Sequence, residues 1–188
     1  MSSLQTVQSL PANPVNAAVT TAQVFNLVQN SAVPATVGVR GKNISNMRKF
    51  RVRATGNVVT AGNYTVQATL LMATAIPATP LVAGNWTVLG AGTARAVNTA
   101  YSPWEIEADD MVFESGGGTM QGTFKQQINN LLDGAAAISN RLTGLNGTNV
   151  TVGSTPPADP VIVFAVALTF STGSASNIGT LGEFVIET

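Results

Sequence analysis

The chain has 188 residues, with nine Lys or Arg against nine Asp or Glu and neither Cys nor His. This length is enough to bury the core of one domain, and the missing residue types exclude disulfides, zinc–thiolate sites, thiol nucleophiles and Ser-His catalysis. No stretch reaches the roughly 18 apolar residues of a membrane span and no secretion-signal pattern opens the chain, so we expect a soluble protein with no membrane partner.

The composition indicates a β-rich protein with an unusually neutral surface. Charged residues make up 10% of the chain, against about a quarter in an average soluble domain. Because a surface near zero net charge promotes association, we expect partner subunits to cover it. Val, Ala and Thr are abundant, and Gly and Asn are plentiful, which predicts many short strands joined by turns.

The N-terminal segment carries no charge before Arg40, and its first part contains Pro11 and Pro14. We predict an extended N-terminal arm over residues 1–16, followed by a single β-sandwich domain over residues 17–188. The inner arm of a genome-enclosing coat protein commonly carries Lys and Arg to neutralise phosphate. An uncharged arm is better suited to pairing with a neighbouring protein subunit, as in strand addition.

Two hairpins are predicted in the first half of the chain. Apolar and polar residues alternate over 50–55 and again over 64–72, with a turn between them, so we expect these two runs to pair. Residues 86–89 and 94–98 flank the glycine-rich turn at 90–92, which predicts a second and tighter hairpin.

A third hairpin runs through the glycine triplet at residues 116–118 into an alternating strand over 120–128. In its first strand, the apolar face that begins at Trp104 changes phase at Asp109-Asp110 and continues at Met111. One extra residue at that point restores the phase, which is the pattern of a β-bulge.

The last third of the chain contains one predicted helix and two predicted strands. Asp133 is a capping residue ahead of an alanine-rich run, and it predicts a short helix over 134–142 within a long loop. The strand over 161–170 is apolar on both faces. We expect the core to cover one face, and a loop or a neighbouring subunit to cover the face of Val161 and Val163. A final strand over 184–188 ends the chain.

Eight or so strands, one helix and no internal repeat predict an all-β protein. We expect a two-sheet antiparallel sandwich of the jelly-roll type.

Five of the nine acids lie within ten residues: Glu105, Glu107, Asp109, Asp110 and Glu114. Alternate residues of a strand are about 6.6–6.8 Å apart, so these carboxylates form a stripe. A calcium site instead needs several oxygens within about 2.3–2.6 Å of one point. We therefore predict a solvated or salt-bridged face in preference to a metal site or a pair of hydrolase carboxylates.

Six of the nine bases lie within fourteen residues: Arg40, Lys42, Arg48, Lys49, Arg51 and Arg53. A nucleic-acid footprint is not favoured, because the chain is neutral and the interleaved Phe50 belongs to the apolar face. We expect these bases to pair with the acidic stripe, either across strands of one chain or between subunits. The predicted interface residues are Arg48, Arg51, Arg53, Glu105, Glu107, Asp109, Val161 and Val163.

The sequence offers no catalytic or cofactor motif, so we predict that the protein is not an enzyme and binds no cofactor. The glycine triplet at 116–118 lacks the Gly-Lys-Ser/Thr ending of a phosphate loop. Trp104 is in phase with the core residues of its strand. Trp86 and Tyr101 could line a carbohydrate cleft, which keeps a tail-fibre or baseplate binding module as an alternative function.

Three features together resemble the jelly-roll decoration, or cement, proteins of tailed-phage capsids. They are the neutral arm over 1–16, the strand–turn–strand segment from Pro103 to Phe124, and the doubly apolar strand over 161–170. The resemblance implies a homotrimer on the outer capsid surface of the virion that contacts the major capsid protein and braces neighbouring capsomers. A coat protein that forms the shell itself is a further alternative.

Overall fold

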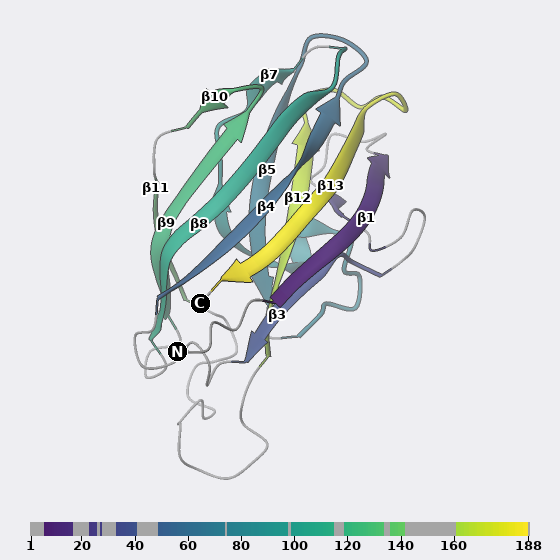
Figure 1. Ribbon diagram of the computed structural model, residues 1–188. Coiled ribbons are helices and arrows are strands. Elements are labelled where there is room, and N and C mark those ends of the chain that lie inside the picture. The colour runs from purple at the N-terminus through teal and green to yellow at the C-terminus, as the bar shows by residue number, and fades with distance from the viewer. Residues whose placement is uncertain are drawn as a thin grey trace.

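In a computed structural model, the chain folds as two antiparallel β-sheets packed face to face (Figure 1). The structure describes residues 6–16, 23–25, 27, 33–40, 49–73, 75–97, 99–114, 119–133, 136–141 and 161–187. Within these residues the helical structure is a single 3-10 turn, η1 (Ala83–Asn85). None of the described residues belongs to a helix long and apolar enough to cross a membrane.

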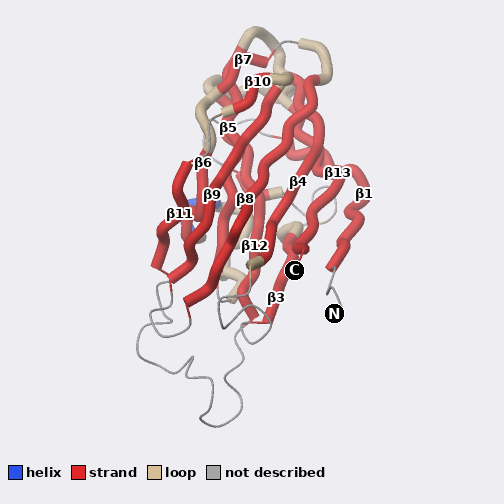
Figure 2. The backbone as a smooth tube through the Cα atoms, turned by 60° about the vertical axis from the view of Figure 1, so that its left-hand side comes forward, coloured by secondary structure: helices blue, strands red, loops and turns tan. Residues whose placement is uncertain are grey.

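Sheet A has seven strands in the order β1-β13-β4-β8-β9-β10, and β11 pairs with β9. Their bounds are Thr6–Asn16 for β1, Ile178–Glu187 for β13, Phe50–Val59 for β4, Ser102–Glu114 for β8, Thr119–Ile128 for β9, Leu131–Leu132 for β10 and Ala136–Arg141 for β11. Figure 2 shows β1 and β11 at opposite edges of this sheet.

Sheet B has six strands in the order β2-β12-β5-β6, with β3 on β12 and β7 on β5. Their bounds are Gln23–Val24 for β2, Val161–Phe170 for β12, Tyr64–Ala73 for β5, Thr87–Ala91 for β6, Thr36–Arg40 for β3 and Arg95–Val97 for β7.

The strand pairing confirms the predicted all-β jelly roll. β1 pairs with β13, β3 with β12, β4 with β8 and β5 with β6. These pairs are nested in the sequence and alternate between sheets A and B, as when a long hairpin is folded over into a double sheet. β9 and β11 extend sheet A after β8.

The core between the sheets is built from alternating strand residues. In β4, Phe50, Val52 and Ala54 are buried while the residues between them are partly exposed. The Trp104 ring in β8 is 2% exposed and stacks on Phe25 at 5.6 Å between ring centroids. Alternation thus leaves one face of sheet A for the core and one for solvent.

Gly56 is required by the close packing of Trp104. A Cβ atom added at Gly56 would lie 1.8 Å from the Thr180 carbonyl oxygen and 2.8 Å from the indole ring. The indole Nε1 donates a hydrogen bond to that same carbonyl oxygen at 3.2 Å. A larger residue would displace both the strand and the ring.

The predicted bulge is present in β8. The register with β9 shifts between Asp109 and Val112, and Asp110 has a φ of 52°. Met111 is fully buried, so the extra residue returns the apolar side chains to the core face. β8 and β9 form the predicted third hairpin, and its turn at 116–118 lies outside the described residues.

The two apolar faces of β12 are both covered, as predicted. Phe164 and its even-numbered neighbours belong to the core between the sheets. Val163, Ala165 and Ala167 belong to a second cluster with Ala83 and Trp86. The cover on the outer face of sheet B is therefore a loop of the same chain.

The two earlier hairpin predictions are wrong. β4 lies in sheet A and β5 in sheet B, so residues 60–63 form a corner between the sheets. Asn177 fixes this corner, because its side-chain Oδ1 accepts a hydrogen bond from the Ala61 N–H at 3.0 Å. β6 and β7 both pair with β5 and not with each other. Alternation identifies a strand but not its partner.

The helix predicted over 134–142 is also wrong. Residues 136–141 form β11, which pairs with β9 along its whole length, and positions 134, 135 and 142 lie outside the described residues. Helix propensity is a weak preference that tertiary context overrides, and here the edge of β9 supplies the backbone hydrogen bonds. Asp133 does not cap a helix; its carboxylate instead accepts hydrogen bonds from Thr93, Arg95 and Gln126.

The predicted arm is described over residues 6–16, where it forms β1 at the edge of sheet A. It pairs antiparallel with β13, and the register shifts between Ser9 and Asn13. This part of the arm is therefore hydrogen-bonded to its own chain, and residues 1–5 lie outside the described part.

Candidate functional site

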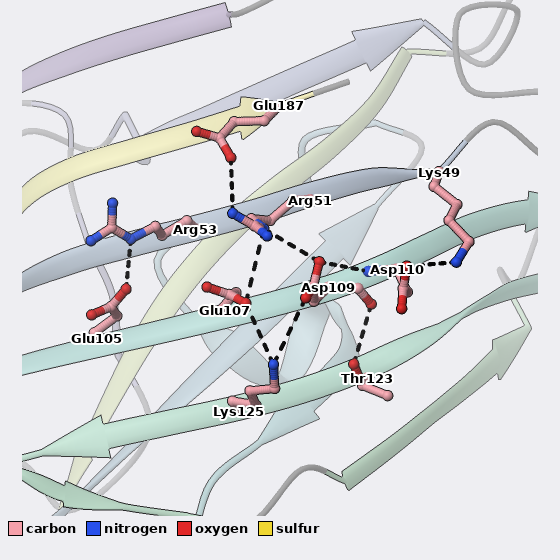
Figure 3. A network of polar contacts seen from close by, with 10 residues as sticks. All are labelled: Lys49, Arg51, Arg53, Glu105, Glu107, Asp109, Asp110, Thr123, Lys125 and Glu187. Carbon is pink, nitrogen blue, oxygen red and sulfur yellow. Dashed lines mark hydrogen bonds and ion pairs between the residues drawn. The ribbon is translucent and has the colours of Figure 1, made fainter.

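Charged side chains gather on the outer face of sheet A (Figure 3). They come from β13, β4, β8 and β9, which are neighbours in the sheet, and from Lys49 directly before β4. We call this set the charged array, and its members are Lys49, Arg51, Arg53, Glu105, Glu107, Asp109, Asp110, Lys125, Glu183 and Glu187. The array exists because the alternate residues of β4 and β8 face the core.

Arg53 joins three strands. Its Nε donates to Glu105 Oε1 on β8 at 2.6 Å, and its Nη1 lies 3.5 Å from Glu183 Oε2 on β13. The residue directly opposite Arg53 in the β4–β8 register is Glu107, so the shortest contact is diagonal. Long side chains reach diagonal neighbours across an antiparallel pair.

Arg51 occupies the centre of the charged array. Its Nε lies 3.3 Å from Asp109 Oδ1 and 3.9 Å from Glu107 Oε1, and its Nη1 lies 3.5 Å from Glu187 Oε2. Lys125 approaches from β9, with its Nζ 3.7 Å from Glu107 and 3.8 Å from Asp109. Glu107 and Asp109 each lie between two cations, as Figure 3 shows.

The bulge shapes one end of the charged array. The Asp110 backbone N–H donates to Asp109 Oδ1 at 2.9 Å, and this bond together with the Arg51 contact holds the pKa of Asp109 below its usual value. The Asp110 side chain pairs with Lys49 at 2.7 Å, which raises the pKa of Lys49. Both members of this last pair are well exposed.

A second polar cluster, in which Asp133 and Gln126 are buried, links the two sheets. Asp133 accepts hydrogen bonds from the Thr93 N–H at 2.6 Å, from Arg95 Nε at 2.7 Å and from Gln126 Nε2 at 2.8 Å. Gln126 Oε1 in turn accepts the Ala68 N–H of β5 at 2.7 Å. The cluster thereby links β9 of sheet A to β5 and β7 of sheet B.

The electrostatics of Asp109 in the charged array do not suit a general acid. A general acid needs a raised pKa, whereas the pKa of Asp109 is lowered by its hydrogen bonds. Glu105 is held by the Arg53 guanidinium at 2.6 Å. The part of the chain that the structure describes contains no group of three or more acids placed to hold a metal ion. The array is suited to fixing strands and presenting paired charges.

A shallow groove of about 350 Å³ lies beside the charged array on the same face. Its polar lining includes Asn57, Glu105, Gln127 and Asn130. Tyr101, two residues before the groove residue Pro103, is 67% exposed, whereas Trp86 is buried. Of the two aromatic side chains considered for a carbohydrate cleft, only Tyr101 is accessible.

The structure brings together five of the predicted interface residues: Arg51, Arg53, Glu105, Glu107 and Asp109. They pair within one chain, which is one of the two arrangements that the sequence left open. Val163 lies on the outer face of sheet B and is 8% exposed under the chain's own loop. Arg48 lies outside the described residues, and so does the Val161 side chain.

Sequence reasoning missed three charges of the array and the pair of Arg95 with the buried Asp133. Lys125 could have been found, because it follows the apolar Phe124 in a predicted strand and so lies on the opposite, polar face of that strand. Glu183 and Glu187 gave no such signal, since the pairing of β13 with β4 joins distant parts of the sequence.

Comparison with known proteins gives no family. Neither a protein-family model nor a curated protein matches the chain. Among solved structures, the crystal structure of SCLam, a non-specific endo-β-1,3(4)-glucanase from family GH16, matches at a TM-score of 0.28 and 7% identity. That match covers 99% of this chain and 71% of the other, and a likeness this low supports no conclusion about activity.

Proposed function

We propose that the protein is a decoration subunit of a tailed-phage capsid. It sits on the outer capsid surface as a homotrimer, contacts the major capsid protein and braces neighbouring capsomers. It acts through protein–protein contacts, without enzymatic activity, cofactor or nucleic acid.

The observation that carries this proposal is the internal pairing of the bases. Every Lys and Arg whose side chain the structure describes is paired with a carboxylate of the same chain: Lys49, Arg51, Arg53, Arg95 and Lys125. Proteins that bind nucleic acid release counterions by placing Lys and Arg against phosphate. Because these bases are already paired with carboxylates, they are poorly suited to binding phosphate. This supports a position on the outside of the capsid, away from the genome.

The fold is compatible with this proposal but does not by itself give the function. Jelly rolls serve as viral capsid domains and also as lectin domains, and one fold hosts many functions. The low charge of the chain, 10% of its residues, adds independent support. A neutral surface favours association over free solution.

Co-sedimentation with capsids tests the proposal. The purified chain is mixed with phage capsids that lack it, and we expect saturable binding at a fixed copy number per capsomer. Light scattering of the free protein should give the mass of a trimer. A monodisperse monomer that does not pellet with capsids would refute the proposal, and closed shells formed by the chain alone would indicate a coat protein.

A carbohydrate-binding module is the second candidate, favoured by the polar groove beside the charged array. Glycan-array binding that is lost in Gln127→Ala, a groove residue, would support it. The matched control is Thr123→Ala, a residue of the same strand that does not line the groove. Equal binding by both variants would count against the groove.

A further inference from the structure

Within the described residues, β1 is attached to the sandwich along one side. Among the described strands it pairs with β13, and no other described element contacts it extensively. The ladder is in two parts, at residues 6–9 and 13–16, with a register shift between them. Pro11 and Pro14 have no N–H to donate, so the strand makes fewer backbone hydrogen bonds than its length allows.

The sheet remains continuous if β1 is taken away. β13 is also paired with β4, from Ile178 to Glu187, and the other three nested pairs of the jelly roll do not involve β1. Removing β1 would uncover the ten-residue edge of β13. An uncovered edge of this length is a template for another strand.

Every copy of the chain carries the same strand and the same edge. The segment known to fit β13 is residues 6–16 in the register that the structure shows. The first 39 residues are uncharged, so docking on another copy meets no charge repulsion from the arm. A second copy of the chain is therefore a partner whose β13 edge is known to fit residues 6–16, because the same pairing occurs within one chain.

We propose that β1 is exchanged between copies, so that residues 6–16 of one chain occupy β13 of its neighbour. The exchange keeps every β1–β13 hydrogen bond and costs mainly the entropy of association. Swapping an identical element is a low-cost route to oligomers. The inference deepens the proposed function, because it names the partner of the arm within the assembly.

The chain connection limits the geometry of the exchange. Residues 17–22 join β1 to β2, and six extended residues span at most about 20 Å. The donor and acceptor edges must therefore lie close together. Head-to-tail exchange of this kind closes into a ring when the rotation between copies permits it, which suits a trimer.

Disulfide trapping tests the exchange. Ser9 and Glu183 are register partners, and antiparallel partners have Cα atoms about 4.5–5.5 Å apart, within the range of a disulfide. The chain has no Cys, so the background is clean. Ser9→Cys and Glu183→Cys are made in separate chains with different tags, assembled together, purified through both tags and oxidised.

We expect a disulfide between Ser9→Cys of one chain and Glu183→Cys of the other. The yield should be about tenfold above that of Ser9→Cys with Thr180→Cys, because residues out of register are too far apart to bridge. Asn16→Cys with Ile178→Cys is a second in-register pair if Glu183→Cys folds poorly. Equal yields from in-register and out-of-register pairs would overturn the proposal.

A double variant with Ser9→Cys and Glu183→Cys in one chain gives the converse measurement. Exchange predicts covalent oligomers on a non-reducing gel, and a linked monomer alone would refute it. The result is separable from the proposed function. Interchain disulfides without capsid binding refute the decoration role only, whereas capsid binding without interchain disulfides refutes the exchange only.

Discussion

On the outer face of sheet A, charged side chains pair across four strands in contact with solvent. On the outer face of sheet B, a buried apolar cluster packs beneath the chain's own loop, with Trp86 6% exposed. The cause is the pattern of the central strands. β4 alternates apolar and polar residues, whereas β12 is apolar on both faces.

The difference shows where the stability of the sandwich resides. Burial of large apolar side chains contributes several kcal/mol each, whereas exposed ion pairs contribute about 0–1 kcal/mol. The covered face of sheet B should therefore be intolerant of substitution. The charged array should tolerate substitution. The side chains on that face could therefore vary to suit a binding partner with little loss of stability.

Trp86→Ala should have the largest effect. The indole covers β12 with Ala83 and donates from Nε1 to the Pro80 carbonyl oxygen at 2.8 Å. Truncation should lower the free energy of unfolding by about 3–4 kcal/mol, measured by urea denaturation. Tyr101→Ala, at an exposed aromatic, is the control and should change it by about 0.5 kcal/mol or less. Equal losses of unfolding free energy in Trp86→Ala and Tyr101→Ala would contradict the conclusion that the covered face of sheet B holds most of the stability.

Asp133→Asn should rank second. The substitution removes the carboxylate from Arg95 and from the link between the two sheets. Asp133 is buried and accepts hydrogen bonds from Thr93, Arg95 and Gln126. Hydrogen bonds to a charged group contribute about 1.5–3 kcal/mol, so we expect thermal and urea unfolding to show a loss of about 2 kcal/mol. Asp110→Asn, in an exposed pair, should leave the unfolding midpoint nearly unchanged. A larger loss in Asp110→Asn would reverse the ranking.

Arg53→Gln should have a smaller effect, on the charged array. Arg53 and Glu105 are each about one-third exposed, and pairs of this kind contribute about 0.2–1 kcal/mol. Salt screens exposed pairs, so the difference between Arg53→Gln and the unchanged chain should shrink in about 1 M NaCl. A difference that persists at high salt would show that Arg53 acts through packing instead.

Local patterns made part of the fold predictable from sequence. The phase change at Asp109-Asp110 indicated the bulge, and the doubly apolar run over 161–170 indicated a covered strand. Both depend on residues within a few positions of one another. The separate basic and acidic stripes of Arg51, Arg53 and Glu105 were identified for the same reason, whereas their pairing joins residues 52 positions apart and was expected only from their opposite charge.

Partner choice was not predictable from the sequence. The corner after β4 depends on Asn177, which is 116 positions from Ala61. The strand at 136–141 forms because β9 offers an edge there, although alanine favours a helix. Jelly-roll pairing is non-local, so strands were easier to identify than the neighbours they contact.

The smallest expected effect is a loss of stability in acid that involves Asp109 on the outer face of sheet A and not the apolar cluster on the outer face of sheet B. Its pKa is lowered in the folded chain, chiefly by the Asp110 N–H and by Arg51. A lowered folded pKa adds stability above the unfolded pKa of about 3.9, and this stability is lost as the pH falls through the folded pKa. Asp109→Asn removes this contribution, so the urea midpoints of the two proteins should differ at pH 6 and should converge as the pH falls through the lowered folded pKa of Asp109. The cluster around Trp86 contains no titratable group, so the loss caused by Trp86→Ala should stay constant over the same range. A gap between Asp109→Asn and the unchanged chain that does not narrow in acid would show that Asp109 stabilises the bulge through its shape and not its charge.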